Sequence, residues 1–234
     1  MKRPVFTLLW LGHTLISCGY GEEQSHGQSS RLAPPLSEWT PPEFAAIADA
    51  SSDTSFIHTE SRYAAPDGQT VLFQNSFPKG GSYLEPGGEV GYTTADGTRY
   101  GIGVFWTRVV NESGGPFTLS LRFPADSFAL AAPDAYYRLS LPTDTMTLAK
   151  RSEFNYGIRR LKPFFDQNLD RPTSLKHTLA TGEEYLFYVA LLIHAPQNGP
   201  IRTALEADAT GALRYRVRVE PLGEQSFSAG RIER

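Results

Sequence analysis

Residues 201–220 have the sequence IRTALEADATGALRYRVRVE, and the alternation within this stretch decides the fold class. From residue 213 to residue 219, apolar side chains alternate with arginines. A period of two is typical of a β-strand with one buried face and one wet face. Residues 208–212, DATGA, have the composition of a turn. The stretch therefore predicts an antiparallel hairpin of residues 201–207 and 213–219.

The register of this hairpin follows from its apolar positions, because a slip of one residue would move every side chain to the other face. Matching the apolar faces sets Leu205 opposite Tyr215 and Ile201 opposite Val219. The connection is then a three-residue loop, residues 209–211, which ends on a glycine. Glycine adopts the left-handed conformation that the last position of such a loop requires.

The outer face of the hairpin carries three arginines, Arg202, Arg216 and Arg218, on a chain of formal net charge −3. The register sets Glu206 opposite Arg214, a favourable pair, and Arg202 opposite Arg218, a repulsive one. One interpretation is a basic stripe that binds phosphate, a lipid headgroup or an acidic partner. The other is a solvated face whose charges protect a sheet edge.

Strand-like patterns recur along the chain, with turn residues between them. They predict six further strands: residues 71–74, 100–110, 117–123, 136–141, 174–179 and 185–194. About eight strands without the regular strand–helix alternation of α/β proteins predict an all-β fold, an antiparallel β-sandwich.

One helical insertion interrupts the strand pattern. Residues 185–193 are apolar on both faces, which predicts a central strand with a cover on its second side. Residues 154–169 have helical spacing, and Pro163 is expected to break or kink that helix. This short irregular helix is our candidate for the cover.

The first residues have the pattern of an export signal. Lys2 and Arg3 precede an apolar stretch, residues 5–16, which is too short to span a bilayer as a helix. A positive head followed by a short apolar core predicts a signal peptide.

The end of the apolar stretch runs into the sequence Leu15-Ile16-Ser17-Cys18, which contains the only cysteine of the chain. The four positions resemble the lipobox of bacterial lipoproteins, in which the chain is cut before the cysteine and the cysteine is acylated. The resemblance covers about the first eighteen residues and implies that Cys18 is lipidated. The alternative is an ordinary signal peptide with an incidental cysteine.

The residues after the cysteine bear on its destination. Gly19 stands where lipoproteins retained in the inner membrane commonly have aspartate, so the resemblance favours the outer membrane. Glu22 and Glu23 weakly resemble the acidic tag that sends some lipoproteins of the Bacteroidota to the cell surface. A solvated acidic tether is the simpler interpretation of these two glutamates.

Three segments follow from these observations. Residues 1–17 are the expected signal peptide, and residues 54–234 the β-sandwich domain. Between them, residues 18–53 hold the lipidated cysteine, a flexible tether and a short helix. The tether, residues 19–38, is rich in Gly, Ser and Pro, and a capping motif with two prolines predicts the helix over residues 41–49.

Motifs that carry chemistry are absent from the sequence. It contains no nucleophile elbow, zinc-protease helix, phosphate-binding loop or EF-hand loop. One cysteine excludes a disulfide within the chain, and His58, His177 and His194 have no metal-ligand spacing. We therefore expect no catalytic residue, no metal and no cofactor, and the negative charge disfavours nucleic-acid binding.

Together with the lipobox resemblance, these observations predict a lipid-anchored, non-enzymatic structural or interaction module of the bacterial cell envelope. Its partners would be the membrane, through the lipid, and an envelope protein or a glycan. The turn at residues 111–116 and the strand after it resemble immunoglobulin-like modules of bacterial surface proteins, which implies a fold but no function.

Two alternatives stay open. One is a surface carbohydrate-binding module, for which the aromatic residues outside the predicted core are the candidates: Trp39, Tyr63, Tyr83, Tyr92 and Tyr136. The other is an envelope hydrolase whose site is assembled from distant strands of the sandwich.

Overall fold

The computed structural model describes residues 53–65, 68–81, 84, 88, 91–195 and 199–233. All of them lie in the second of the two units into which the chain divides, Pro42–Arg234. The expected signal peptide, the lipidation site Cys18, the tether and the helix over residues 41–49 lie outside the described residues.

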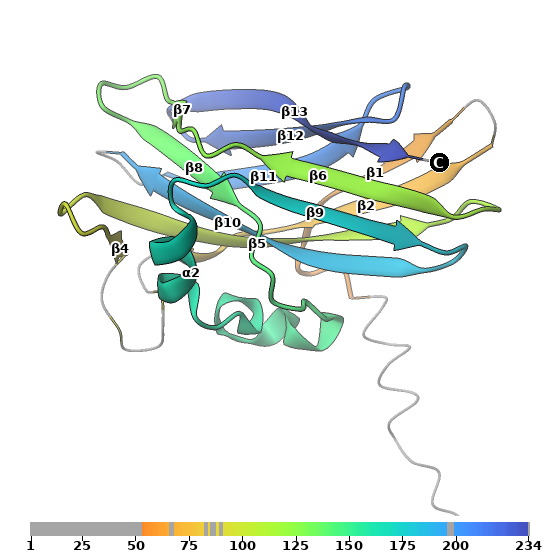
Figure 1. The fold of residues 1–234 in the computed structure, drawn as a ribbon, viewed down its shortest axis with the longest axis horizontal. Coiled ribbons are helices and arrows are strands. Elements are labelled where there is room, and N and C mark those ends of the chain that lie inside the picture. Colours follow the sequence, from red (N-terminus) through yellow and green to blue (C-terminus); the bar gives the residue numbers. More distant parts are fainter. Residues whose placement is uncertain are drawn as a thin grey trace, which may run out of the picture. The chain divides into compact units, whose positions relative to one another are not determined.

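The described part of the chain is mostly β and forms two curled antiparallel sheets (Figure 1). One sheet has eight strands: β1 (Ile57–Ala64), β2 (Thr70–Ser76), β3 (Lys79–Gly81), β4 (Tyr92–Thr93), β5 (Arg99–Asn111), β7 (Phe128–Ala129), β8 (Tyr136–Ser140) and β10 (Glu184–His194). Their order is β1-β2-β5-β10-β8-β7, and β3 and β4 also pair with β5.

The other sheet has five strands in the order β11-β12-β13-β6-β9. Their bounds are β6 (Phe117–Phe123), β9 (Thr173–Leu179), β11 (Ile201–Ala207), β12 (Ala212–Val219) and β13 (Gly223–Glu233). The eight predicted strands are all present. Five strands, β1, β3, β4, β7 and β13, were not predicted, because they are short or carry mostly polar residues.

The hairpin β11–β12 has the predicted register. Leu205 lies opposite Tyr215, Ile201 lies opposite Val219, and the amide of Asp208 donates to the carbonyl of Ala212 at 2.9 Å. Gly211 ends the three-residue loop with φ +80°, the left-handed conformation that the turn requires.

The charge pairing on the outer face of this hairpin differs from the prediction. Glu206 lies opposite Arg214 in the register, but its carboxylate pairs with Arg216 on the diagonal, at 2.6 Å. Arg214 instead donates from Nε to the hydroxyl of Ser226 at 3.2 Å. Diagonal neighbours on a sheet are within reach of side chains as long as arginine, which accounts for the difference.

A large hydrophobic cluster draws its side chains from both sheets. The eight-stranded sheet contributes residues such as Phe73, Phe105 and Val189, all at most 1 % exposed. The five-stranded sheet contributes residues such as Leu119 and Val217. Full burial stabilises the fold by about 1.5–3 kcal/mol for each side chain of this size.

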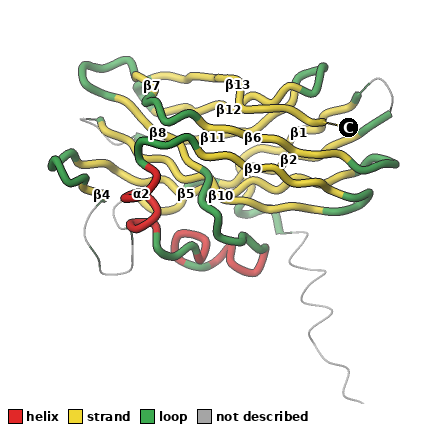
Figure 2. Tube along the Cα trace, viewed as in Figure 1, coloured by secondary structure: helices red, strands yellow, loops and turns green. Residues whose placement is uncertain are grey.

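A second cluster lies on the other face of the eight-stranded sheet, under a helical cover. The cover consists of two 3₁₀ helices, η2 (Leu148–Ser152) and η3 (Phe154–Gly157), and the α-helix α2 (Leu161–Asn168). Figure 2 shows these helices gathered on one side of the strands. β10, between β5 and β8, is therefore the central, doubly covered strand that the sequence predicted.

Pro163 does not break the helix. It occupies the first turn of α2, where the backbone amide has no partner within the helix and proline is tolerated. The helical segment is interrupted earlier in the chain. Arg160, the N-cap residue of α2, has φ 60°, and this left-handed conformation separates η3 from α2.

The two sheets meet along β11, which lies against β1 and β2. Asn75 of β2 is 2 % exposed, and its side-chain amide bonds to the backbone of Leu205 in β11. Nδ2 donates to the carbonyl at 3.2 Å, and Oδ1 accepts from the amide at 2.9 Å. Ala204, on the outer face of β11, is only 2 % exposed, so this face is less solvated than the sequence suggested.

Candidate functional site

The three arginines singled out in the sequence lie around one open pocket of about 260 Å³, which we call the hairpin pocket. Strands β1, β11, β12 and β13 supply its wall, together with Glu220, which follows β12. The lining residues are His58, Thr59, Arg202, Thr203, Ala204, Arg216, Arg218, Glu220 and Glu224. Guanidinium, imidazole and hydroxyl groups are the side chains that bind oxyanions.

Carboxylates balance two of these arginines. Arg216 pairs with Glu206 at 2.6 Å and with Glu224 at 3.8 Å, and Arg218 pairs with Glu220 at 2.8 Å. All five side chains are at least 39 % exposed, so each pair contributes at most about 1 kcal/mol to stability. The hairpin pocket is thus a mixed-charge surface rather than a purely basic stripe.

Arg202 has no carboxylate partner among the described residues. Its guanidinium lies 5.3 Å from the ring centre of Phe77, within cation–π range, and Nη1 donates to the carbonyl of Ile201 at 2.8 Å. Phe77 is 37 % exposed, which makes it one of two large exposed hydrophobic residues in the described part of the chain.

His58 lies next to the same aromatic ring, with 5.1 Å between the ring centres of His58 and Phe77. Its side chain forms no hydrogen bond with a described residue. Burial lowers the pKa of His58, and the positive charges of Arg202 and Arg216 lower it further. Both effects favour the neutral form of the imidazole.

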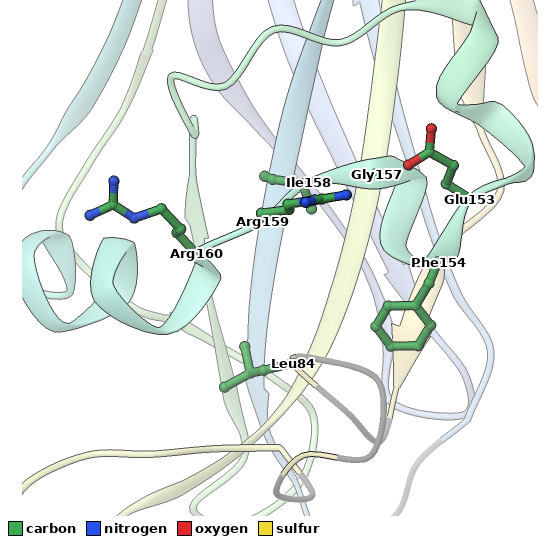
Figure 3. Close-up of a pocket in the computed structure, with 7 residues that line it drawn as sticks. All are labelled: Leu84, Glu153, Phe154, Gly157, Ile158, Arg159 and Arg160. Carbon is green, nitrogen blue, oxygen red and sulfur yellow. The ribbon is translucent and has the colours of Figure 1, made fainter.

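A second pocket, of about 450 Å³, opens at the helical cover and is lined by Leu84, Glu153, Phe154, Gly157, Ile158, Arg159 and Arg160 (Figure 3). Phe154 is 45 % exposed, and Figure 3 shows Arg160 pointing away from Phe154 and Glu153. Residues 82–83 and 85–87, on either side of Leu84 in the sequence, lie outside the described ranges.

The backbone beside this second pocket is strained. Asn155 and Tyr156 have φ 47° and 57°, a left-handed conformation that costs about 1–3 kcal/mol per residue. Hydrogen bonds from neighbouring elements hold it in place. The Tyr188 hydroxyl donates to the Tyr156 carbonyl at 2.6 Å, and the Tyr156 hydroxyl donates to the Phe77 carbonyl at 2.7 Å.

No protein family, no curated protein and no solved structure matches this chain. The function is therefore inferred from the residues themselves.

The other histidines form contacts of their own. The ring of His177 stacks on the ring of Tyr185, with 3.8 Å between the ring centres. Nδ1 of His194, the last residue of β10, lies 2.8 Å from the carbonyl oxygen of Arg99. In the described ranges, no three His, Cys, Asp or Glu residues lie together in a way that would hold a metal ion.

Two of the aromatic residues proposed for sugar stacking are buried. Tyr63 is 7 % exposed and Tyr92 is 2 % exposed, so the prediction that they are free is wrong. The ring of Tyr92 packs against Phe165 of α2 at 5.2 Å. Burial, together with a hydrogen bond to Asp166, raises the pKa of Tyr92 to about 12.

The remaining aromatic candidates do not form a platform within the described residues. Tyr136 is half-buried, and its hydroxyl lies 3.0 Å from that of Tyr100. Trp39 and Tyr83 lie outside the described ranges.

Among the described helices, none is long and apolar enough to cross a membrane.

Proposed function

We propose that this protein is a lipid-anchored, non-enzymatic interaction module of the bacterial cell envelope, and that the hairpin pocket receives an anionic group of its partner. One observation carries the interaction role. Arg202, Arg216 and Arg218 gather around one pocket, and His58 joins them from another strand. Several guanidinium groups facing one space are the usual means by which proteins bind carboxylate and phosphate groups.

We also propose that the two sheets close as a β-sandwich. Support comes from the hydrophobic cluster to which both sheets contribute. The hydrogen bonds between Asn75 and the backbone of Leu205 support closure along one side. Two antiparallel sheets with their apolar faces together have the layered arrangement of that fold.

The anchor is the first part of the proposal to test. Cys18→Ser is expected to release the protein from membranes or to leave it unprocessed, because the acyl chains supply the membrane affinity at about 0.8 kcal/mol per buried CH₂. Membrane fractionation and the mass of the mature N-terminal peptide measure this effect. Unchanged fractionation of the variant, with no acyl mass on the wild-type peptide, would contradict it.

The interaction role is tested with the full-length acylated protein and detergent-solubilised envelopes. Arg216→Ala with Arg218→Ala is expected to weaken retention of an envelope partner about tenfold, and more at low salt than at high salt. The fold should persist, because the two side chains are 39 % and 56 % exposed.

Arg214→Ala is the matched control, because Arg214 is an exposed arginine of the same strand that does not line the pocket. Its retention of the partner should equal that of the wild type. Equal retention by the double variant at every salt concentration would contradict the role of the pocket.

A carbohydrate-binding module is the second candidate, and one observation favours it. Phe77 is exposed and lies close to two residues that line the hairpin pocket, Arg202 and His58. An aromatic face next to cationic groups suits an acidic sugar. Enrichment of acidic glycans rather than a protein in the same envelope experiment, with loss of that enrichment in Phe77→Ala, would favour this candidate.

A further inference from the structure

The arginines of the hairpin pocket keep hydrogen-bond donors for a ligand. A guanidinium group has five N–H donors. In the described part of the chain, Arg202 uses one of them, toward the Ile201 carbonyl, and Arg216 uses one, toward Glu206. Both arginines line the pocket, so most of their donors are available to an anion placed there.

The carboxylates around the pocket do not occupy the space next to Arg202. Glu206 is bound to Arg216 and Glu220 to Arg218. Glu224 lies 3.8 Å from Arg216, which is beyond hydrogen-bond distance. Arg202 is therefore the position at which an incoming anion meets the least competition, and Arg216 is the arginine whose contact with Glu224 is too long for a hydrogen bond.

His58 stands against these two arginines. Arg202 faces it from β11 and Arg216 from β12, and both oppose its protonation. Arg218 and Glu220, and Glu224 from β13, belong to the same pocket wall. Glu60, two residues along β1, is bound by Gln74 at 2.8 Å and paired with Arg62, so it does not serve as a counter-ion for His58.

We propose that the hairpin pocket binds a tetrahedral dianion, such as the phosphate group of an ester, between Arg202 and Arg216, and that His58 takes up one proton from solvent as the dianion binds. The inference rests on the proposed interaction function and names the chemistry of its partner. A dianion next to His58 offsets the repulsion from the two arginines and stabilises the imidazolium, which then donates a hydrogen bond to an anion oxygen.

The direction of the pH effect follows from linkage. The bound dianion raises the pKa of His58, whereas in the empty pocket burial and the arginines lower it. Between these two pKa values a proton is taken up with each anion, so affinity increases as the pH falls. Two opposite charges about 4 Å apart at a protein surface attract each other more strongly than in bulk water, so we expect about tenfold tighter binding at pH 5.5 than at pH 7.5.

Sulfate is the probe, because it remains a dianion over this whole pH range. The full-length mature protein in detergent is titrated with sulfate by calorimetry at pH 5.5, 6.5 and 7.5, with chloride holding the ionic strength constant. The ring resonances of His58 are followed by NMR from low to high pH, with and without sulfate. We expect saturable binding to one site, tighter at low pH, and a higher pKa of His58 when sulfate is present.

Three variants separate the roles of the residues. Arg202→Gln is expected to weaken sulfate binding about tenfold at each pH, and His58→Asn to remove the pH dependence while sulfate still binds at pH 7.5. Arg214→Gln, the control, should bind like the wild type. Absence of saturable binding at every pH would overturn the proposal. A pKa of His58 that sulfate leaves unchanged, or equal losses in Arg202→Gln and Arg214→Gln, would also overturn it.

Two competitors identify the source of the dianion. Displacement of sulfate by glucose 6-phosphate supports the proposal with a soluble ester as ligand, and displacement only by phosphatidate in mixed micelles of the same detergent supports it with a lipid headgroup. If sulfate does not bind but the acylated protein still retains an envelope partner through Arg216 and Arg218, the inference fails and the proposed function stands.

Discussion

Asn75→Ala is expected to lower the free energy of unfolding by about 3–4 kcal/mol. The Asn75 side chain is 2 % exposed and takes part in four hydrogen bonds. Nδ2 donates to Thr59 Oγ1 and to the Leu205 carbonyl, both at 3.2 Å. Oδ1 accepts from the Leu205 amide at 2.9 Å and from Thr107 Oγ1 at 3.0 Å.

The size of this effect comes from the groups that alanine would leave behind. The side-chain amide of Asn75 takes the role of a peptide unit in a neighbouring strand. It gives one hydrogen-bond donor and one acceptor to β11, which is an edge strand of its sheet. Leu205 is fully buried, so its backbone N–H and C=O would lose their partner away from water. Each buried polar group left unpaired costs about 1–3 kcal/mol.

Urea unfolding followed by tryptophan fluorescence and by circular dichroism measures the loss. Gln74→Ala is the matched control, since Gln74 is the neighbouring residue, is 7 % exposed and bonds to two charged side chains, Glu60 and Arg108. These partners reach water, so the control should lose only about 1 kcal/mol. Equal losses in both variants would contradict the role that we give to Asn75.

Asn75→Asp tests the direction in which the stability of the variant changes with pH. It keeps the shape but puts a carboxyl group into a buried site, which raises the folded-state pKa above the unfolded value of about 3.9. The folded state then binds more protons, so the stability contributed by this group falls as the pH rises through the folded pKa. The deficit relative to the wild type at the same pH should therefore be larger at pH 7 than at pH 4.

Strict alternation made the hairpin predictable to the residue. In β12 every second side chain is apolar, and Gly211 marks the end of the loop, so sequence alone fixed which side chains face each other. β13 escaped prediction because its alternation is broken. Its register against β12 shifts beside Leu213, and Gly230 comes so close to Ser120 of β6 that a Cβ atom there would lie 1.9 Å from the carbonyl oxygen.

The candidate site was only half predictable. Arg202, Arg216 and Arg218 share a face of one hairpin, so a period of two and a register were sufficient to place them together. His58 reaches the pocket from β1, and Phe77, which follows β2, lies against His58 and Arg202, because β1 and β2 pack against β11. No local pattern marks a residue for a contact at that sequence distance. The diagonal pairing of Glu206 with Arg216 likewise depends on side-chain conformation, which alternation does not specify.

The packing of the helical cover depends on Trp106, which lies in the middle of β5. Its side chain is 0 % exposed and packs in the cluster between the eight-stranded sheet and the cover. The rings of Trp106 and Tyr156 meet edge to face, with 6.3 Å between centres and an interplanar angle of 83°. Tyr156 belongs to η3, so this contact joins the sheet directly to the strained turn of the cover.

Trp106→Ala is expected to lower the free energy of unfolding by about 4 kcal/mol, because it removes the largest side chain of the cluster and leaves a cavity under the cover. Trp106→Phe is the matched control. Nε1 of Trp106 has no hydrogen-bond partner among the described residues. Phenylalanine at this position therefore removes side-chain volume but no hydrogen bond, and it should lower the free energy of unfolding by only about 1–2 kcal/mol. Guanidinium unfolding gives both values, and limited proteolysis with mass spectrometry should locate the first new cuts of the alanine variant in residues 141–172. First cuts in the β11–β12 hairpin instead would show that Trp106 stabilises the sheets rather than the cover.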